Sequence, residues 1–205
     1  MPKHHKENPK RDSTAKPLQS TLKVLGGIYK GRKLQMASLQ TTRSSKAILK
    51  ESFFNTLGFQ LFGANFVEFF AGSGSIGIEA LSRGAKSALF FERSSAACEI
   101  LQMNLQTICQ NDESYRVVLG DTFECYRTAL KDLQVRSIAY LDPPFPREDS
   151  QIYPKCFQMV EDLDRDCFAL VVIEHISSLE IPQNIGDFVL VKTRKFGRSS
   201  LSYFE

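Results

Sequence analysis

From Asn65 onward the sequence repeats one unit, in which a short apolar run is followed by a loop and an amphipathic segment. The apolar runs are continuous rather than alternating, which is typical of parallel strands covered on both faces. Strands are predicted at Phe66–Phe70, Ser87–Phe91, Arg116–Leu119, Ile138–Leu141 and Phe168–Glu174. Helices are predicted between them at about 75–83, 95–109, 122–132 and 152–162. The repeat restricts the fold to an α/β class with a mostly parallel, doubly wound sheet.

The end of the chain departs from this unit. Phe188–Arg194 and Ser200–Phe204 flank the tight connection Lys195-Phe-Gly-Arg198, and together they predict an antiparallel hairpin. A doubly wound sheet closed by a terminal hairpin is typical of the Rossmann-like fold of methyltransferases that use S-adenosylmethionine (SAM). A dinucleotide-binding fold more often ends in parallel strands.

A smaller extension is expected before the sheet. Residues 1–20 are polar, basic and interrupted by three prolines, and they predict a disordered tail. Thr21–Leu25 and Arg32–Met36 predict a short β-hairpin, and Ser45–Phe59 predicts a helix. We therefore expect an extension over 21–60 and a catalytic domain over 61–205.

Charge is distributed unevenly along the chain. Residues 1–57 carry 12 Lys/Arg and 3 Asp/Glu, whereas the remaining residues carry 14 and 20. A basic front end on an acidic body indicates a polyanionic partner. The alternative is a solvated tail that only keeps the protein soluble.

The cysteines indicate the compartment. The five cysteines are far apart and show no C-x-x-C spacing, so reduced core thiols in a cytoplasmic protein are expected rather than disulfides or a zinc site. The first 20 residues lack the apolar segment of a signal peptide, and no run approaches membrane-spanning length. We expect a monomer without metal.

The first predicted strand leads into a glycine loop, Glu68-Phe-Phe-Ala71-Gly72-Ser73-Gly74. Gly72-Ser-Gly-Ser-Ile-Gly77 matches G-x-G-x-x-G, in which glycines let the backbone approach a nucleotide and helix N–H groups face it. The motif fits NAD as well as SAM. The candidate cofactor residues in it are Glu68, Ala71, Gly72, Ser73 and Gly74.

Carboxylates end the next two strands. Glu92 follows the second strand and could accept from both ribose hydroxyls, and Asp121, before Thr122, could accept from the adenine amino group. Taken singly, such residues are more often helix N-caps or surface charges. In register beside a glycine loop they indicate a cofactor site.

Asp142-Pro143-Pro144-Phe145 follows the fourth predicted strand. Two prolines stiffen the backbone and remove two donors. Asp142 and the Pro143 carbonyl could accept both N–H groups of an exocyclic amine while Phe145 stacks on the base, which predicts amine methylation. A strand-ending turn is the alternative. His175 could face the same cleft, although a satisfied core or surface histidine is the commoner case.

Four segments together resemble the RsmD family of bacterial 16S rRNA guanine-N2 methyltransferases. They are Leu22-Lys-Val-Leu-Gly-Gly-Ile-Tyr-Lys-Gly-Arg-Lys-Leu34, Lys50-Glu-Ser-Phe-Phe-Asn-Thr-Leu57, Phe69 to Ala85 with its phrase Glu79-Ala-Leu-Ser-Arg-Gly-Ala85, and Asp142-Pro-Pro-Phe145. The terminal Arg194 to Phe204 is also similar to the family's last hairpin. The resemblance spans residues 22–204.

The resemblance implies SAM as cofactor and a guanine of 16S rRNA in a partly assembled 30S particle as substrate. Tyr29, Arg32, Lys33, Arg43 and Lys46 would then contact the RNA. One stretch departs from the family: Arg43-Ser-Ser-Lys-Ala47-Ile48 stands where an Arg-x-Thr-Thr-Asp-Arg stretch is usual. The competing functions are an adenine-N6 or protein-glutamine methyltransferase, an NAD-dependent oxidoreductase and a non-catalytic rRNA-binding assembly factor.

Overall fold

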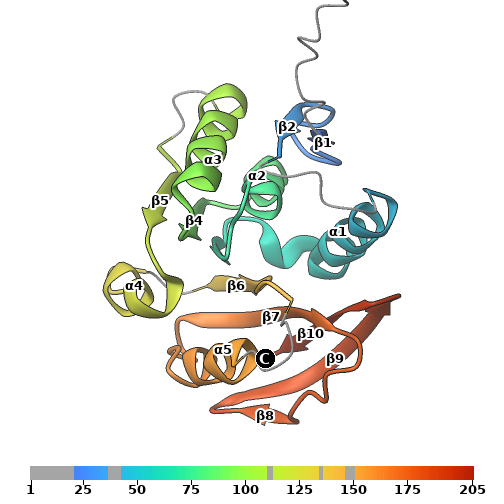
Figure 1. The fold of residues 1–205 in the computed structure, drawn as a ribbon, viewed down its shortest axis with the longest axis vertical. Coiled ribbons are helices and arrows are strands. Elements are labelled where there is room, and N and C mark those ends of the chain that lie inside the picture. The colour runs from blue at the N-terminus through green and yellow to red at the C-terminus, as the bar shows by residue number, and fades with distance from the viewer. Residues whose placement is uncertain (1–20, 37–42, 110–112, 134–135, 146–150) are drawn as a thin grey trace, which may run out of the picture.

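An eight-stranded sheet organises the described part of the chain (Figure 1). The computed structural model describes residues 21–36, 43–109, 113–133, 136–145 and 151–205, so the predicted tail 1–20 lies outside the described residues. The strand order is β5-β4-β3-β6-β7-β10-β9-β8. The strands are β3 (Asn65–Phe69), β4 (Ser87–Glu92), β5 (Tyr115–Leu119), β6 (Ser137–Leu141), β7 (Phe168–Ile176), β8 (Asn184–Ile185), β9 (Phe188–Phe196) and β10 (Ser199–Phe204).

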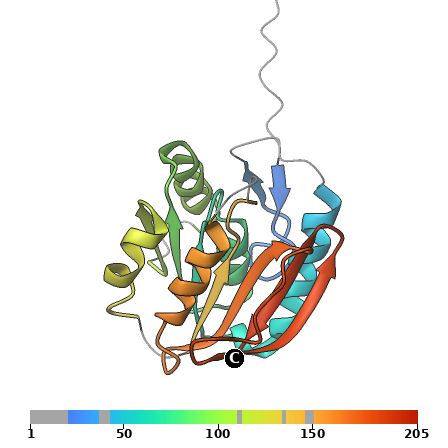
Figure 2. The ribbon, with the colours of Figure 1, turned by 60° about the horizontal axis from the view of Figure 1, so that its bottom comes forward.

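Helices cover both faces of this sheet (Figure 2). They are α1 (Arg43–Leu57), α2 (Ser75–Ser82), α3 (Ser95–Ile108), α4 (Thr122–Ala129) and α5 (Ile152–Glu161). Phe53 of α1 packs in one core cluster with Phe66 and Tyr140 of the sheet. Met159 of α5 packs in another cluster with Val67 and its neighbours on the opposite face. Because each central strand is buried on both faces, its sequence is continuously apolar, and the predicted doubly wound α/β fold is confirmed.

The five strands β3 to β7 are mutually parallel and the terminal strands are not. The chain moves from β3 outward through β4 and β5, then returns to β6 on the other side of β3. Strand order therefore reverses between β3 and β6. In open α/β sheets ligands bind at such a point, outside the carboxyl ends of the strands. We call this side of the sheet the carboxyl edge.

The predicted terminal hairpin is present. β10 pairs antiparallel with both β7 and β9, and the two-residue β8, which the sequence did not indicate, pairs antiparallel with β9. Because β9 is antiparallel to β10, it runs parallel to β7, and its end at Phe196 lies at the carboxyl edge.

The N-terminal extension consists of an arm and a helix. In the arm, residues 21–36, β1 (Thr21–Lys23) and β2 (Lys33–Gln35) form the predicted hairpin as a separate two-stranded sheet. The α1 helix begins and ends two residues before its predicted limits and is followed by the 3-10 turn η1 (Gly58–Leu61). No helix in the described ranges is both long and apolar enough to cross a membrane.

Candidate functional site

Two loops that are far apart in sequence leave the sheet side by side. The cofactor loop, residues 70–74, follows β3, and the target loop, Asp142–Phe145, follows β6. β3 and β6 are adjacent parallel strands in which Phe69 and Leu141 are register partners. The two loops therefore start at the same level of the carboxyl edge, where strand order reverses.

The cofactor loop has an unusual backbone. Phe70 adopts φ 69°, a left-handed conformation that is rare for an aromatic residue and that clusters at functional sites. Gly72 has φ 55°, and a Cβ placed on it would meet nothing within 4 Å. A Cβ on Gly77 would instead lie 2.3 Å from the Phe90 ring. Gly72 thus leaves open space for a ligand, whereas Gly77 permits close packing of α2 on the sheet.

Glu68 lies beneath this loop rather than in it. Its buried carboxylate accepts hydrogen bonds from the backbone N–H groups of Ile76 (3.3 Å) and Gly77 (2.8 Å) at the start of α2. Burial raises the pKa of Glu68 to about 8, although these two hydrogen bonds lower it. The predicted cofactor residue therefore fixes the helix that follows the loop.

Glu92 ends β4 directly beside the cofactor loop. One carboxylate oxygen accepts from the Gly72 N–H (2.7 Å) and the other from the Ser94 N–H (2.7 Å). Each carboxylate oxygen has a further lone pair, so Glu92 can still accept from two ligand hydroxyls. The acceptor pair, together with the open space at Gly72, fits the ribose of a nucleoside cofactor such as SAM.

The remaining predicted cofactor residues surround the same loop. Ala71 and Ser73 are buried within it, and Gly74 is the left-handed residue that precedes α2. Asp121 is the N-cap of α4 and accepts from the Phe123 N–H (2.9 Å), with Thr122 buried behind it. Asp121 therefore caps a helix, which was the alternative to cofactor binding in the sequence analysis. A contact between Asp121 and a cofactor would be made in addition to this hydrogen bond.

The arm packs against the cofactor loop through a buried amide. Asn104 of α3 accepts from the Gln35 N–H (2.8 Å) and donates to the carbonyl oxygens of Gln35 and Ser73, both at 3.0 Å. The Ser73 hydroxyl also lies 3.2 Å from the Met36 sulfur. The sequence did not identify Asn104, because a lone asparagine on a helix has no distinguishing pattern.

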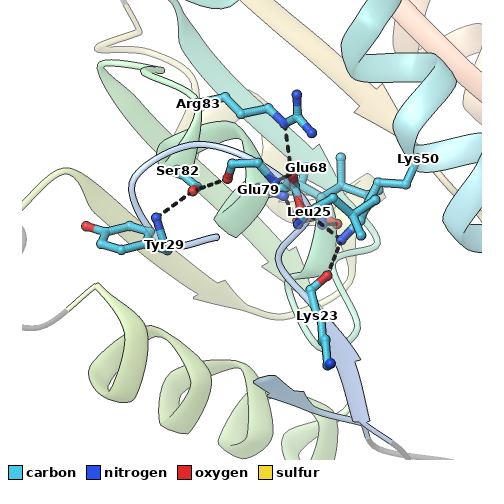
Figure 3. Close-up of polar contacts among 11 residues, drawn as sticks. Lys23, Leu25, Tyr29, Lys50, Glu68, Glu79, Ser82 and Arg83 are labelled. Carbon is cyan, nitrogen blue, oxygen red and sulfur yellow. Dashed lines mark hydrogen bonds and ion pairs between the residues drawn. The ribbon is translucent and has the colours of Figure 1, made fainter. Parts of the chain in front are cut away.

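A second anchor of the arm is the fully buried Glu79 of α2 (Figure 3). Its carboxylate accepts from the N–H groups of Leu25 (2.8 Å) and Gly26 (2.7 Å). It also forms ion pairs with Lys50 of α1 (3.1 Å) and Arg83 (2.8 Å). The cluster joins the arm, α1 and α2 into one support for the site.

The target loop contains an ion pair that the sequence did not predict. Lys46 of α1 places Nζ 3.3 Å from Oδ2 of Asp142. The charge of Asp142 raises the pKa of Lys46 against the opposing effect of burial, with smaller contributions from Glu174 and Glu68. Pro143 is buried, whereas the Phe145 ring is 45% exposed and available for stacking.

Glu174 is a buried carboxyl group close enough to Asp142 for the two charges to interact. Glu174 of β7 accepts from the Tyr140 hydroxyl at 2.8 Å through Oε2. Its other oxygen, Oε1, is buried without a hydrogen bond of standard geometry to any described residue. Burial, and then the charge of Asp142, raise the pKa of Glu174 to about 7, although Lys46, Tyr140 and the nearby Ser199 hydroxyl lower it. A glutamate at the end of an otherwise apolar strand was the signal in the sequence.

The predicted RNA-contacting residues do not form one group. Arg32 donates to the carbonyl of Thr107, near the end of α3, and the Tyr29 N–H donates to Ser82, which ends α2. Helices that follow parallel strands end at the edge opposite the carboxyl edge. Lys33 is exposed on β2, and Arg43 begins α1. Among the four of them whose side chains the structure describes, Lys46 is the one that contacts the target loop.

His175 is a satisfied core residue. It is 2% exposed, and its ring nitrogens lie 2.8 Å from the Ile176 carbonyl and 2.9 Å from the Ser202 hydroxyl. Burial lowers the pKa of His175. The prediction of a core histidine is confirmed.

Comparison with known proteins assigns the family. A family described as "Conserved hypothetical protein 95" matches residues 22–205. The chain belongs to this RsmD-type family. YlbH of Bacillus subtilis, named as a candidate rRNA methyltransferase, is 30% identical over 185 residues, which cover 90% of this chain and 98% of that protein. Ribosomal RNA small subunit methyltransferase D of Haemophilus influenzae is 32% identical over 124 residues, or 60% and 64% of the two chains.

Solved structures agree with this assignment. YhhF of Escherichia coli, described as a candidate methyltransferase, superposes with a TM-score of 0.70 and 27% identity over 90% of this chain and 97% of that one. The magnesium protoporphyrin IX methyltransferase of Synechocystis, solved with bound SAM, has a TM-score of 0.56 at 11% identity, covering 82% of this chain and 86% of that one. The second likeness shows the fold alone.

Proposed function

We propose that this protein is a SAM-dependent rRNA methyltransferase that methylates the exocyclic N2 amine of a guanine in 16S rRNA. The observation that carries the proposal is the shared level of the cofactor loop and the target loop on adjacent strands. On this placement, Asp142 would accept from the target amine, and Gly72 and Glu92 nearby would hold the nucleoside of the cofactor. The names of the relatives support rRNA as the substrate class, and the choice of guanine N2 rests on the resemblance to the RsmD family.

Asp142 and Pro143 would bind the target amine. The amine lone pair is delocalised into the base, so hydrogen bonds from both N–H groups to the Asp142 carboxylate and the Pro143 carbonyl hold it directed at the incoming methyl group. SAM, when bound, supplies an electrophilic methyl group on a positively charged sulfur. Asp142 would favour the positive charge that the amine nitrogen gains with the methyl group, and it or water would take the proton that the nitrogen then loses.

The surroundings of Asp142 favour that positive charge. The charge of Asp142 raises the pKa of Lys46, and the same charge would favour a positive charge on the target nitrogen. The Lys46 ammonium already contacts Oδ2 of Asp142, so the target amine would compete with it for this carboxylate. Lys46 would therefore release Asp142 when the base docks, and an RNA phosphate is a suitable new partner for it.

The exposed Phe145 ring would stack on the extruded base. An adenine-N6 methyltransferase could use the same acceptors, since adenine also carries an exocyclic amine. An NAD-dependent oxidoreductase would leave the target loop without a role.

Two measurements test this function. Calorimetric titration with SAM and with NAD⁺ should show binding of SAM alone. Incubation with tritiated SAM and immature 30S particles should then place the label in 16S rRNA. NAD⁺ binding without SAM binding would indicate an oxidoreductase, and SAM binding without label in the rRNA would exclude 16S rRNA as substrate.

A further inference from the structure

The terminal hairpin, residues 188–205, carries a net positive charge, and none of its basic side chains belongs to the site described above. Residues 188–205 contain four basic side chains and one acidic residue, Glu205, although residues 58–205 as a whole are acidic. All four basic side chains are exposed: Lys192, Arg194, Lys195 and Arg198. The resemblance to the family's last hairpin gave them no role.

The sheet topology places the end of β9, with its basic side chains, at the same edge of the sheet as the target loop. β9 runs parallel to β6 and β7, so Arg194 and the turn at Gly197 and Arg198 lie toward the carboxyl edge, where Asp142 also lies. β9 lies beside α1, the helix that carries Lys46 (Figure 2).

A groove of about 580 Å³ lies between these two elements. Its lining is mostly polar and contains two cations, one carboxylate, two hydroxyls, one amide and one apolar side chain. These residues are Lys192, Arg194, Glu51, Ser52, Thr56, Asn55 and Ile48. Arg194 donates to the Ser52 hydroxyl at 2.6 Å and to the Thr56 hydroxyl at 3.4 Å. These two bonds use one guanidinium nitrogen, Nη1, so other N–H groups of Arg194 can bind a ligand.

Lys192 lies over an aromatic ring of the neighbouring strand β10. Its ammonium lies 5.9 Å from the centre of the Tyr203 ring, a cation–π contact that keeps the side chain on this face of the hairpin. The groove lining includes Ile48, which is two residues after Lys46 but on a different side of α1. Cations are thus present both along the groove and at the target loop.

We propose that the groove between α1 and β9 binds the sugar-phosphate backbone of the RNA strand next to the methylated nucleotide. The proposal rests on the proposed function. An RNA backbone is favoured because cations meet phosphates while Ser52, Asn55 and Thr56 supply hydrogen bonds to phosphate and ribose. Glu51 is the one acidic side chain in the lining, and a ribose 2′-hydroxyl can donate to it.

The test is the salt dependence of binding to a protein-free 16S rRNA transcript. Lys192→Gln/Arg194→Gln should reduce the slope of log affinity against log salt by about 1.4, since each lost phosphate contact on a single strand removes about 0.7. Lys192→Arg/Arg194→Lys keeps both charges and should retain the wild-type slope. Lys131→Gln, beyond α4, is the matched single-charge control.

The outcomes separate this inference from the proposed function. SAM affinity and the unfolding midpoint of each variant, measured first, establish that the protein is folded. Wild-type methylation of immature 30S particles reports on the proposed function alone. An unchanged salt slope in the double Gln variant would overturn the groove proposal. A loss confined to 30S particles, with the protein-free transcript bound normally, would overturn it too, because the groove would then contact a ribosomal protein.

Discussion

At the scale of single residues, the contact between Lys46 and Asp142 bears on the proposed reaction. Nζ of Lys46 lies 3.3 Å from Oδ2 of Asp142. In the proposed mechanism the target amine would compete with Lys46 for this carboxylate. The exposed position of Lys46 on α1 leaves it free to turn toward an RNA phosphate.

Lys46→Met removes this competitor from Asp142. At saturating RNA the single-turnover methylation rate should equal or exceed that of the wild type, while affinity for RNA falls by about 1 kcal/mol or less because one exposed cation is lost. Rapid-quench assays over a range of RNA concentrations separate the two effects, with Lys131→Met as control. A tenfold slower rate at saturation would mean that Lys46 holds Asp142 in its reactive position.

Glu92→Ala tests the candidate cofactor site formed by Gly72 and Glu92. The substitution removes acceptors for two ribose hydroxyls and for the N–H groups of Gly72 and Ser94. We expect SAM affinity to fall by about 1–3 kcal/mol, measured by calorimetry. Glu99→Ala, on the exposed face of α3, controls for loss of a carboxylate. Wild-type affinity in Glu92→Ala would exclude the ribose assignment.

At the scale of elements, the arm depends on the Glu79 cluster. Glu79→Ala leaves Lys50 buried without its carboxylate partner and frees the Leu25 and Gly26 N–H groups. Removal of one member of a buried ion pair costs about 3–5 kcal/mol. Urea unfolding should show this loss, and limited proteolysis should show faster cleavage within residues 21–36.

A matched double variant sharpens this prediction. Glu79→Met/Lys50→Met removes the two buried charges, so it should be less destabilising than Glu79→Ala, because only the partly exposed Arg83 then lacks its carboxylate partner. Equal stability of Glu79→Ala and wild type would show that the cluster does not anchor the arm.

The contacts of the Glu79 cluster could not be predicted from the sequence, although the helices and strands around it could. Each predicted strand and helix is present, because continuous apolar runs and a 3.6-residue period are local signals. β8 was missed because Asn184–Ile185 is too short to show a period, and its pairing depends on β9. The phrase from Glu79 to Ala85 stood out in the sequence, but its partners at Leu25 and Gly26 are more than 50 residues away. Such contacts have no local pattern.

At the scale of the whole molecule, buried carboxyl groups link stability to pH. The pKa values of Glu68 and Glu174 are raised from 4.5 to about 8 and about 7. In this range the folded protein holds protons that the unfolded chain has released, so unfolding releases protons and a higher pH favours it. His175, whose pKa is lowered by burial, acts in the opposite direction only at more acidic pH.

The free energy of unfolding should therefore fall between about pH 6.5 and about pH 8, and it should level off above the raised pKa of Glu68. Each carboxyl group contributes at most about 1.4 kcal/mol per pH unit. Glu68→Gln should flatten this dependence, whereas Glu99→Gln serves as the control for the substitution itself. Urea titrations at several pH values measure it. Stability that stays level or rises over this range would contradict the assigned burial effects.

The overall architecture follows from sequence more completely than the site does. The order of apolar runs and the terminal hairpin indicate a doubly wound sheet, and that sheet places Gly72, Glu92 and Asp142 along one edge. The pairing of Lys46 with Asp142 spans 96 residues and depends on how α1 crosses the sheet, so charge alone assigned Lys46 to RNA. Glu174 was seen only as the end of a strand, because its partner Tyr140 lies on the neighbouring strand.

The most direct test of the whole account is single-turnover methylation of immature 30S particles by wild type and Asp142→Ala, with the product nucleoside identified by mass spectrometry. In the proposed mechanism Asp142 would accept from the target amine most strongly as positive charge develops on nitrogen, so its loss would act on the chemical step. We expect N2-methylguanosine from the wild type and a rate at least about 100-fold lower in Asp142→Ala, about 3 kcal/mol, with SAM affinity nearly intact. N2-methylguanosine formed at the wild-type rate by Asp142→Ala would contradict the mechanism, and a methylated adenine would contradict the substrate.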